Sequence, residues 1–172
     1  MVPIITFKDL DFNFKYEIMG ESGGKNILKC FSCNTCTLSC PVRAVDDEYN
    51  PRSIIRLAIL GAKDEVLSST FIWLCSSCYL CYERCPQDVR ITDLMDAIKN
   101  VAVKHGYLPD TYIGQIELLK DHGRLYEIGD FENKKRAKLG LPVIEEKSED
   151  ASKVLEVTGA LKLLLKEEVR NG

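Results

Sequence analysis

The 172-residue sequence predicts a mainly α-helical fold organised around two cysteine-rich loops. All eight cysteines fall into two copies of the pattern C-x2-C-x2-C-x3-C-P, and each cysteine of the second copy lies 45 residues after its counterpart. Helix-capping residues occupy the segment between the copies, and apolar residues recur at helical spacing after the second copy. These three observations favour a repeated loop packed between helices.

The doubled pattern is the ligand run of two-cluster ferredoxins, which bind two 4Fe-4S cubanes. A cubane presents four irons at the corners of a tetrahedron, and a loop with two residues between cysteines can reach three of them. In such proteins the fourth cysteine of each run binds the other cluster. The sequence therefore predicts one cluster on Cys30, Cys33, Cys36 and Cys85, and a second cluster on Cys75, Cys78, Cys81 and Cys40.

Two other uses of cysteine compete with this interpretation. Zinc sites pair C-x2-C units around one tetrahedral ion, whereas here a triplet recurs with a fourth cysteine and a proline at the same offset. Disulfide frameworks are typical of short secreted chains. The N-terminus has neither a basic region nor a long apolar region of the kind found in signal peptides, and no apolar stretch approaches a membrane span. We therefore expect a reducing, cytoplasmic location.

Composition indicates an ordinary globular protein. Hydrophobic residues make up 45% of the chain and charged residues 28%, with a formal net charge of -3. Since thiolate ligands would add further negative charge, nucleic acid is not expected as a partner. The sequence also contains no phosphate-binding glycine loop, and no cysteine is left over for thiol exchange.

Helix signals follow both cysteine runs. Asn50 as N-cap, Pro51 at the first helical position and Gly61 as terminator predict a helix between the runs. A short helix is expected over residues 64–68, and another from Thr92, as its cap, to His105.

The ends of the chain are less regular. Residues 111–122 predict a helix ended by Gly123, and residues 11–19 favour a short helix although their apolar alternation would also suit a strand. A charged linker precedes an apolar stripe from Val154 to Val169, which predicts an amphipathic helix. The stripe leaves open whether this helix packs on the chain itself or on a partner protein. His105 and His122 are expected to cap helix C-termini rather than to bind metal.

Three segments resemble the C subunit of heterodisulfide reductase from methanogenic archaea. They are the cysteine run at 29–41, the motif Asn50-Pro51-Arg52, and the second run with Trp73 and Leu74 before it. The likeness is strongest over residues 24–106 and looser around residues 136–142. It divides the chain into an N-terminal extension at 1–23, a helical two-cluster ferredoxin domain at 24–106, a helical extension at 107–145, and a linker with the amphipathic helix at 146–172.

The resemblance implies an electron-transfer protein of a larger complex, without a substrate-converting site of its own. Electrons would pass one at a time from the flavin-containing A subunit of such a complex, through the two 4Fe-4S clusters, to the B subunit with its cysteine-rich domains. That last partner would reduce the mixed disulfide of coenzyme M and coenzyme B. A hydrogenase or formate dehydrogenase could complete the assembly.

Other assignments remain open on the sequence alone. Similar helical two-cluster modules occur in the iron-sulfur subunits of glycerol-3-phosphate dehydrogenase and fumarate reductase. One alternative is a stand-alone oxidoreductase, which would need an open iron position or a substrate pocket beside a cluster. Another is a structural module, in which the clusters only stabilise the fold.

Overall fold

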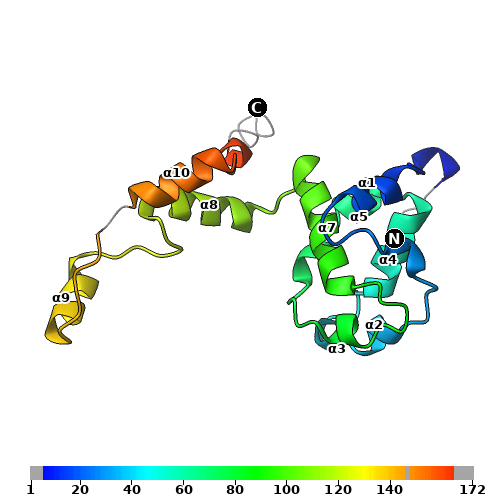
Figure 1. Ribbon diagram of the computed structural model, residues 1–172, viewed down its shortest axis with the longest axis horizontal. Helices are drawn as coiled ribbons and strands as arrows, with labels where there is room; N and C mark the ends of the chain where they lie inside the picture. The colour runs from blue at the N-terminus through cyan, green and yellow to red at the C-terminus, as the bar shows by residue number, and fades with distance from the viewer. Residues whose placement is uncertain (1–5, 146–147, 165–172) are drawn as a thin grey trace. The chain divides into compact units, whose positions relative to one another are not determined.

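The computed structural model describes residues 6–145 and 148–164, and this part of the chain is helical without a β-strand. The predicted mainly α-helical fold is confirmed. The chain divides into two compact units, Met1–Tyr107 and Leu108–Gly172, which are described separately below. In the first unit, α2 and α3 lie at the end opposite α1 (Figure 1).

Helix α4, Pro51–Leu60, forms as its sequence predicts. The side chain of Asn50 accepts a hydrogen bond from the Ser53 amide at 3.0 Å, and Pro51 takes the first helical position, where no amide donor is needed. Gly61 ends the helix in the left-handed conformation, with φ of 94°. Helix α5, Lys63–Leu67, follows almost at once, close to the predicted range of 64–68.

The core of the first unit lies between α4, the long helix α7 (Ile91–Lys104) and the N-terminal helix α1 (Phe14–Gly20). Apolar residues recur along α7 at helical spacing, and Leu94, Ile98 and Val101 are fully buried. Phe14 and Ile18 from α1 are also fully buried, so the N-terminal helix contributes to the same core.

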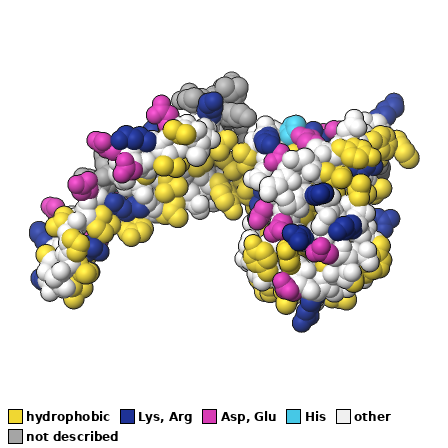
Figure 2. Space-filling model, viewed as in Figure 1, with side chains coloured by type: hydrophobic (Ala, Val, Ile, Leu, Met, Phe, Trp, Pro, Cys, Tyr) yellow, Lys and Arg dark blue, Asp and Glu magenta, His cyan; other side chains and the backbone are white. Residues whose placement is uncertain are grey.

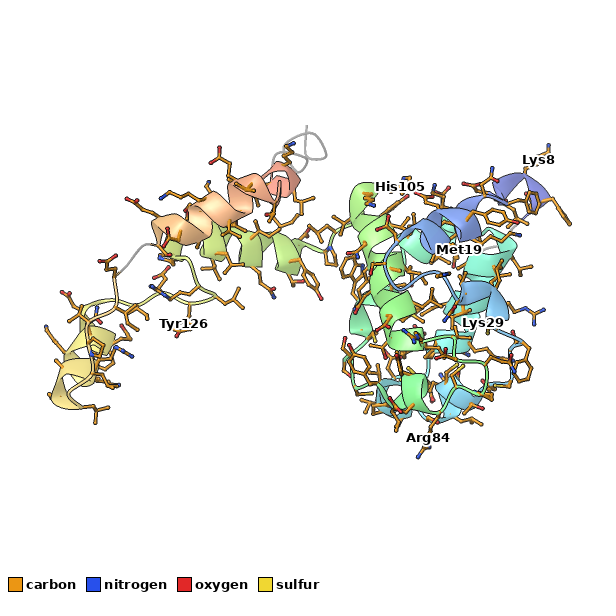
Figure 3. All side chains as sticks on the ribbon, viewed as in Figure 1. Lys8, Met19, Lys29, Arg84, His105 and Tyr126 are labelled. Atoms are coloured by element: carbon orange, nitrogen blue, oxygen red, sulfur yellow. The ribbon has the colours of Figure 1, made fainter. Side chains whose placement is uncertain are left out.

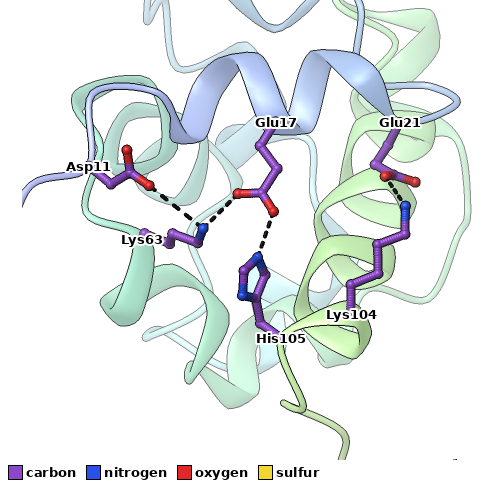
Figure 4. Close-up of polar contacts among 6 residues, drawn as sticks. All are labelled: Asp11, Glu17, Glu21, Lys63, Lys104 and His105. Atoms are coloured by element: carbon purple, nitrogen blue, oxygen red, sulfur yellow. Dashed lines mark hydrogen bonds and ion pairs between the residues drawn. The ribbon is translucent and has the colours of Figure 1, made fainter.

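Polar contacts hold α1 against the ends of the other helices (Figure 4). Glu17 lies 2.7 Å from Nζ of Lys63 and 2.6 Å from Nε2 of His105, and Glu21 pairs with Lys104. A close backbone contact adds to them: the amide of Asp11 donates to the carbonyl of Gly61 at 2.7 Å. Helix α1 is therefore joined to both α5 and the C-terminal end of α7.

The structure corrects the predicted start of α7. Thr92 was expected to cap this helix, but Arg90 takes the cap position with a left-handed backbone, and the helix begins at Ile91. Thr92 lies inside the first turn, is 1% exposed, and places its hydroxyl 3.8 Å from the sulfur of Cys81. The hydroxyl therefore contacts a cysteine of the second run instead of capping the helix.

The second unit is built from α8 (Asp110–His122), α9 (Asp130–Lys138) and α10 (Glu149–Val157). Gly123 ends α8 in the left-handed conformation, as its position predicts. Ser148 caps α10, which packs against α8, so within this unit the amphipathic helix covers part of its own chain. Helix α10 stops at Val157 before Gly159, where φ is 76°, and the predicted continuation from residue 165 to Val169 lies outside the described residues.

Few side chains are buried in the second unit. Ile113 and Ile128 are buried, whereas Leu125, Phe131 and Val157 are exposed. Figure 2 shows apolar side chains among the charged ones on the surface of this unit. Two hydrogen bonds between Asn133 and the backbone of Ile144 hold the segment after α9 against that helix.

Candidate iron-sulfur site

The two cysteine runs fold into equivalent local structures. Helix α2, Thr35–Leu38, has its counterpart 45 residues later in α6, Leu80–Glu83, and a short 3-10 helix precedes each run: η2 (Ile27–Lys29) and η3 (Thr70–Leu74). Ser32 and Asn34 adopt positive φ, and so do their counterparts Ser77 and Tyr79. Non-glycine residues rarely accept this conformation, so their recurrence at the same offset marks a shared loop geometry.

Positive φ angles at alternating loop positions suit a loop that wraps an anionic group. Backbone amides that turn toward one point in such loops form concave anion sites, which iron-sulfur centres use. The geometry of both runs is therefore compatible with a cluster whose sulfurs and thiolate ligands carry negative charge.

The structure brings the eight cysteines together in two sets. One cavity is lined by Cys30, Cys33, Cys36 and Cys85. A second cavity is lined by Cys40, Cys75, Cys78 and Cys81. Each set thus contains three cysteines of one run and the last cysteine of the other run. Ile91 lines both cavities, so they adjoin. We call them the Cys30 cavity and the Cys75 cavity.

All eight cysteines are free thiols, and the two runs lie at the end of the unit away from His105, near the labelled Arg84 (Figure 3). Among the described residues, no group of three or more His, Cys, Asp or Glu side chains is close enough to bind one metal ion. Such a group is not required for a cubane, because each cysteine binds a different iron of the cluster.

The thiols differ in their electrostatic surroundings. Burial raises the pKa of Cys36 to about 11, and burial also raises the pKa of Cys81. Cys33 is exposed, and a hydrogen bond with the Thr35 hydroxyl at 3.3 Å lowers its pKa. Because thiolates bind iron, the buried cysteines must release their protons when a cluster is bound.

Two polar side chains contact sulfur in the Cys75 cavity. Tyr49 is 1% exposed, and burial together with its interaction with the Cys75 sulfur raises the pKa of its phenol. The Thr92 hydroxyl lies 3.8 Å from Cys81, as described above. Both groups are neutral hydroxyls that can donate to a thiolate, and hydrogen bonds to sulfur ligands are among the factors that tune an iron-sulfur centre.

An unpaired donor lies in the Cys30 cavity. Arg52 lines this cavity, and its buried Nε has no hydrogen-bond partner. A buried guanidinium N–H without an acceptor is costly in free energy. An anionic cluster on the four cysteines would supply acceptor sulfurs and a compensating charge. The donor set, the free thiols and this unpaired cation therefore fit a 4Fe-4S cluster.

Comparison with known proteins agrees with this geometry. Residues 26–89 match the family model described as a 4Fe-4S dicluster domain, which establishes two 4Fe-4S clusters as the cofactors. The C subunit of the H(2):CoB-CoM heterodisulfide,ferredoxin reductase of Methanothermobacter thermautotrophicus is 35% identical over 163 residues, covering 91% of this chain and 87% of the relative. The chain belongs to the family of heterodisulfide reductase C subunits.

Further relatives carry related names. The iron-sulfur C subunit of the CoB--CoM heterodisulfide reductase of Methanopyrus kandleri is 34% identical, covering 94% of this chain and 91% of the relative. The C subunit of the Ferredoxin:CoB-CoM heterodisulfide reductase of Methanosarcina mazei is 36% identical, covering 85% and 88%. Membership of this family makes the chain an iron-sulfur component of an oxidoreductase, as the resemblance implies.

Sequence reasoning missed the roles of three side chains of this chain. Arg52 was noted only as part of a motif, Thr92 was predicted to be a helix cap, and Tyr49 was not singled out. One signal was present in the sequence, namely the unequal length of the connections between each cysteine run and the next long helix. Nine residues separate Cys40 from Asn50, which caps α4. Only four residues separate Cys85 from Arg90, which occupies the cap of α7. The longer connection carries Tyr49 and α3, Pro41–Val45.

None of the described helices is both long enough and apolar enough to cross a membrane.

Proposed function

We propose that this chain relays single electrons through its two 4Fe-4S clusters inside a heterodisulfide reductase complex. The observation that supports this most directly is the pair of adjoining cavities, each lined by four cysteine thiols drawn from both runs. Two redox centres held side by side in one core suit transfer from one partner to another.

We infer the crossed ligation from the same two cavities. Cys30, Cys33, Cys36 and Cys85 would hold one cluster, and Cys40, Cys75, Cys78 and Cys81 would hold the other. When bound, the clusters supply one-electron oxidation and reduction. The residues of the chain hold the cysteine side chains in place: the Thr35 hydroxyl is hydrogen-bonded to Cys33, and Thr92 lies beside Cys81.

With four protein thiolates for each cubane, no iron is left open to a substrate. We therefore expect conversion of the CoM-S-S-CoB heterodisulfide on a partner with cysteine-rich domains, the B subunit, with electrons supplied by a flavin-containing partner, the A subunit. A hydrogenase or formate dehydrogenase could serve as the first donor in the larger assembly. Free cysteines that must stay reduced until clusters are inserted suit the cytoplasm.

The test uses the complex purified without oxygen. We expect about eight irons and about eight acid-labile sulfides in this chain, and absorption that bleaches when the electron donor of the complex is added. Rapid mixing should show that both clusters are reduced at least as fast as the complex turns over. Zinc in place of iron, or full activity while the clusters stay oxidised, would contradict the proposal.

A control separates electron transfer from a structural role. Cys33 and Cys78 are the two exposed ligands, so their replacement by serine disturbs the core least. We expect each variant to stay in the complex and to lose most of its heterodisulfide reduction, while the partner proteins keep their own cofactors. Unchanged heterodisulfide reduction in both variants would show that the clusters only stabilise the structure.

A further inference from the structure

The two cavities differ in the charge of the side chains that line them. Among the described residues that line the Cys30 cavity, Arg52 alone has a charged side chain. The described residues that line the Cys75 cavity carry no acidic or basic side chain, and their polar groups other than cysteine are Tyr49, Ser76 and Thr92. A cation is therefore present in one cysteine cavity and missing from the lining of the other.

The fold holds Arg52 in place at the beginning of α4. It is the second residue of that helix, and its backbone amide donates to the Thr37 hydroxyl at 3.3 Å, next to the buried Cys36. Within the described part of the chain no carboxylate forms an ion pair with Arg52, and its Nε is buried without an acceptor. Among the described residues, no acidic side chain therefore neutralises its charge.

The helix after the second cysteine run gives Arg52 a structural counterpart. Helices α4 and α7 both follow a Cys-Pro pair, and each presents its second residue to the cysteine run that precedes it: Arg52 in α4 and Thr92 in α7. The second position of the helix thus carries a guanidinium beside one set of cysteines and a hydroxyl beside the other. This is a difference between the two cluster sites rather than a feature of the loop.

Reduction adds one negative charge to a cluster, so a nearby cation stabilises the reduced state and raises the reduction potential. Tyr49 acts in the same direction on the other site through the Cys75 sulfur. However, hydrogen bonds from a charged donor are roughly twice as strong as those between neutral groups. The Arg52 charge also acts on the whole cluster and not on a single sulfur. The effect of Arg52 therefore exceeds that of Tyr49.

We propose that Arg52 raises the reduction potential of the cluster in the Cys30 cavity above that of the cluster in the Cys75 cavity. An electron shared by the two sites then rests mainly on the Cys30 side. The partner that donates electrons would dock nearer the Cys75 cavity, and the partner that accepts them nearer the Cys30 cavity. This inference rests on the proposed electron relay and adds its direction.

The test is a redox titration of the cluster-loaded chain, followed by electron paramagnetic resonance. The signal of each site is assigned with Cys33→Ser and Cys78→Ser, which lie in different cavities whether or not the fourth ligands cross. In the unchanged chain we expect the Cys30-side cluster to be reduced first. Arg52→Gln should lower the equilibrium constant for its reduction about tenfold, which is about 59 mV for one electron, and leave the other cluster nearly unchanged.

Two variants provide the controls. Arg56→Gln removes the same charge from an exposed position one turn further along α4, and it should shift neither potential appreciably. Arg52→Lys keeps the positive charge and should keep the order of the two potentials, and it also serves if Arg52→Gln fails to bind its clusters.

Several results would overturn the inference. They are a lower potential on the Cys30 side in the unchanged chain, an equal shift of both clusters in Arg52→Gln, and loss of the order of potentials in Arg52→Lys. In each case both clusters would still accept electrons, so the proposed relay would stand. Clusters that no donor can reduce would instead defeat the relay itself.

Discussion

Nε2 of His105 lies 2.6 Å from Oε1 of Glu17, so the residue that ends α7 contacts the middle of α1 (Figure 4). The same carboxylate lies 2.7 Å from Lys63, which joins a third segment to the contact. From the sequence, His105 is expected to cap its helix, and the structure places it at that cap with an acidic partner from the N-terminal helix. This contact fixes the C-terminal end of α7, and Ile91 at the other end of that helix lines both cysteine cavities.

The Glu17 network predicts a pH-dependent stability. Burial raises the pKa of Glu17, but hydrogen bonds from Lys63 and His105 outweigh it, and the net pKa is lowered from its usual value. A carboxyl whose pKa is lower in the folded state stabilises the fold above its unfolded pKa, and this contribution is lost as pH falls through the folded pKa. Glu17→Gln should therefore reduce the free energy of unfolding by about 1 kcal/mol near pH 7, and by less in acid.

Thermal unfolding under anaerobic conditions, from about pH 7 to about pH 4, measures this difference. Glu65→Gln is the matched control, because Glu65 is exposed on α5. Equal losses in the two variants at neutral pH would show that the network adds nothing specific.

The crossed cysteine sets predict which ligand variants behave alike. Cys85→Ala should alter the same paramagnetic signal as Cys30→Ala, because both thiols line one cavity although they come from different runs. Cys40→Ala should group with Cys75→Ala for the same reason. The measurement is electron paramagnetic resonance of each reduced variant. Grouping of Cys85 with Cys75 would show that each run holds its own cluster.

The cap of α4 predicts a loss of stability beyond that of an ordinary helix cap. Oδ1 of Asn50 accepts from the Ser53 amide at 3.0 Å and from the buried Thr37 hydroxyl at 2.9 Å. Asn50→Ala removes the cap, which costs about 1 kcal/mol, and takes away the acceptor to which the Thr37 hydroxyl donates, which costs about 1 kcal/mol more. Chemical denaturation should show the sum of these two losses in the free energy of unfolding. Asn50→Asp keeps both acceptor contacts and should lose much less.

Two glycines with similar backbone angles should differ in how much their replacement by alanine destabilises the protein. Gly61 has φ of 94° and Gly106 has φ of 84°, so alanine is strained at both, by about 1–2 kcal/mol. A Cβ on Gly61 would also lie 2.4 Å from the carbonyl oxygen of Asp11, whereas a Cβ on Gly106 would have no atom within 4 Å. Gly61→Ala should therefore destabilise the protein more than Gly106→Ala in thermal unfolding. Equal melting temperatures would mean that the Asp11 segment can move aside.

Much of the local structure could be predicted from the sequence, because the signals act over a few residues. Asn50, Pro51 and Gly61 mark the bounds of α4 through backbone hydrogen bonds and allowed backbone angles, and Gly123 does the same for α8. Thr92 shows where this reasoning failed. A threonine near a helix start has the properties of a cap, but the turn at Arg90 places it two positions past the cap, inside the helix.

The doubled cysteine pattern by itself determined the kind of cofactor, the number of clusters and the expected ligand sets, because iron coordination requires thiolates at that spacing. Only the tertiary structure decided what surrounds each set. Tyr49 lies beside Cys75, Arg52 enters the Cys30 cavity, and Phe14 of α1 joins the core. These positions depend on packing between segments distant in sequence. No local pattern encodes such contacts, and they make two nearly identical ligand loops into two different electrostatic sites.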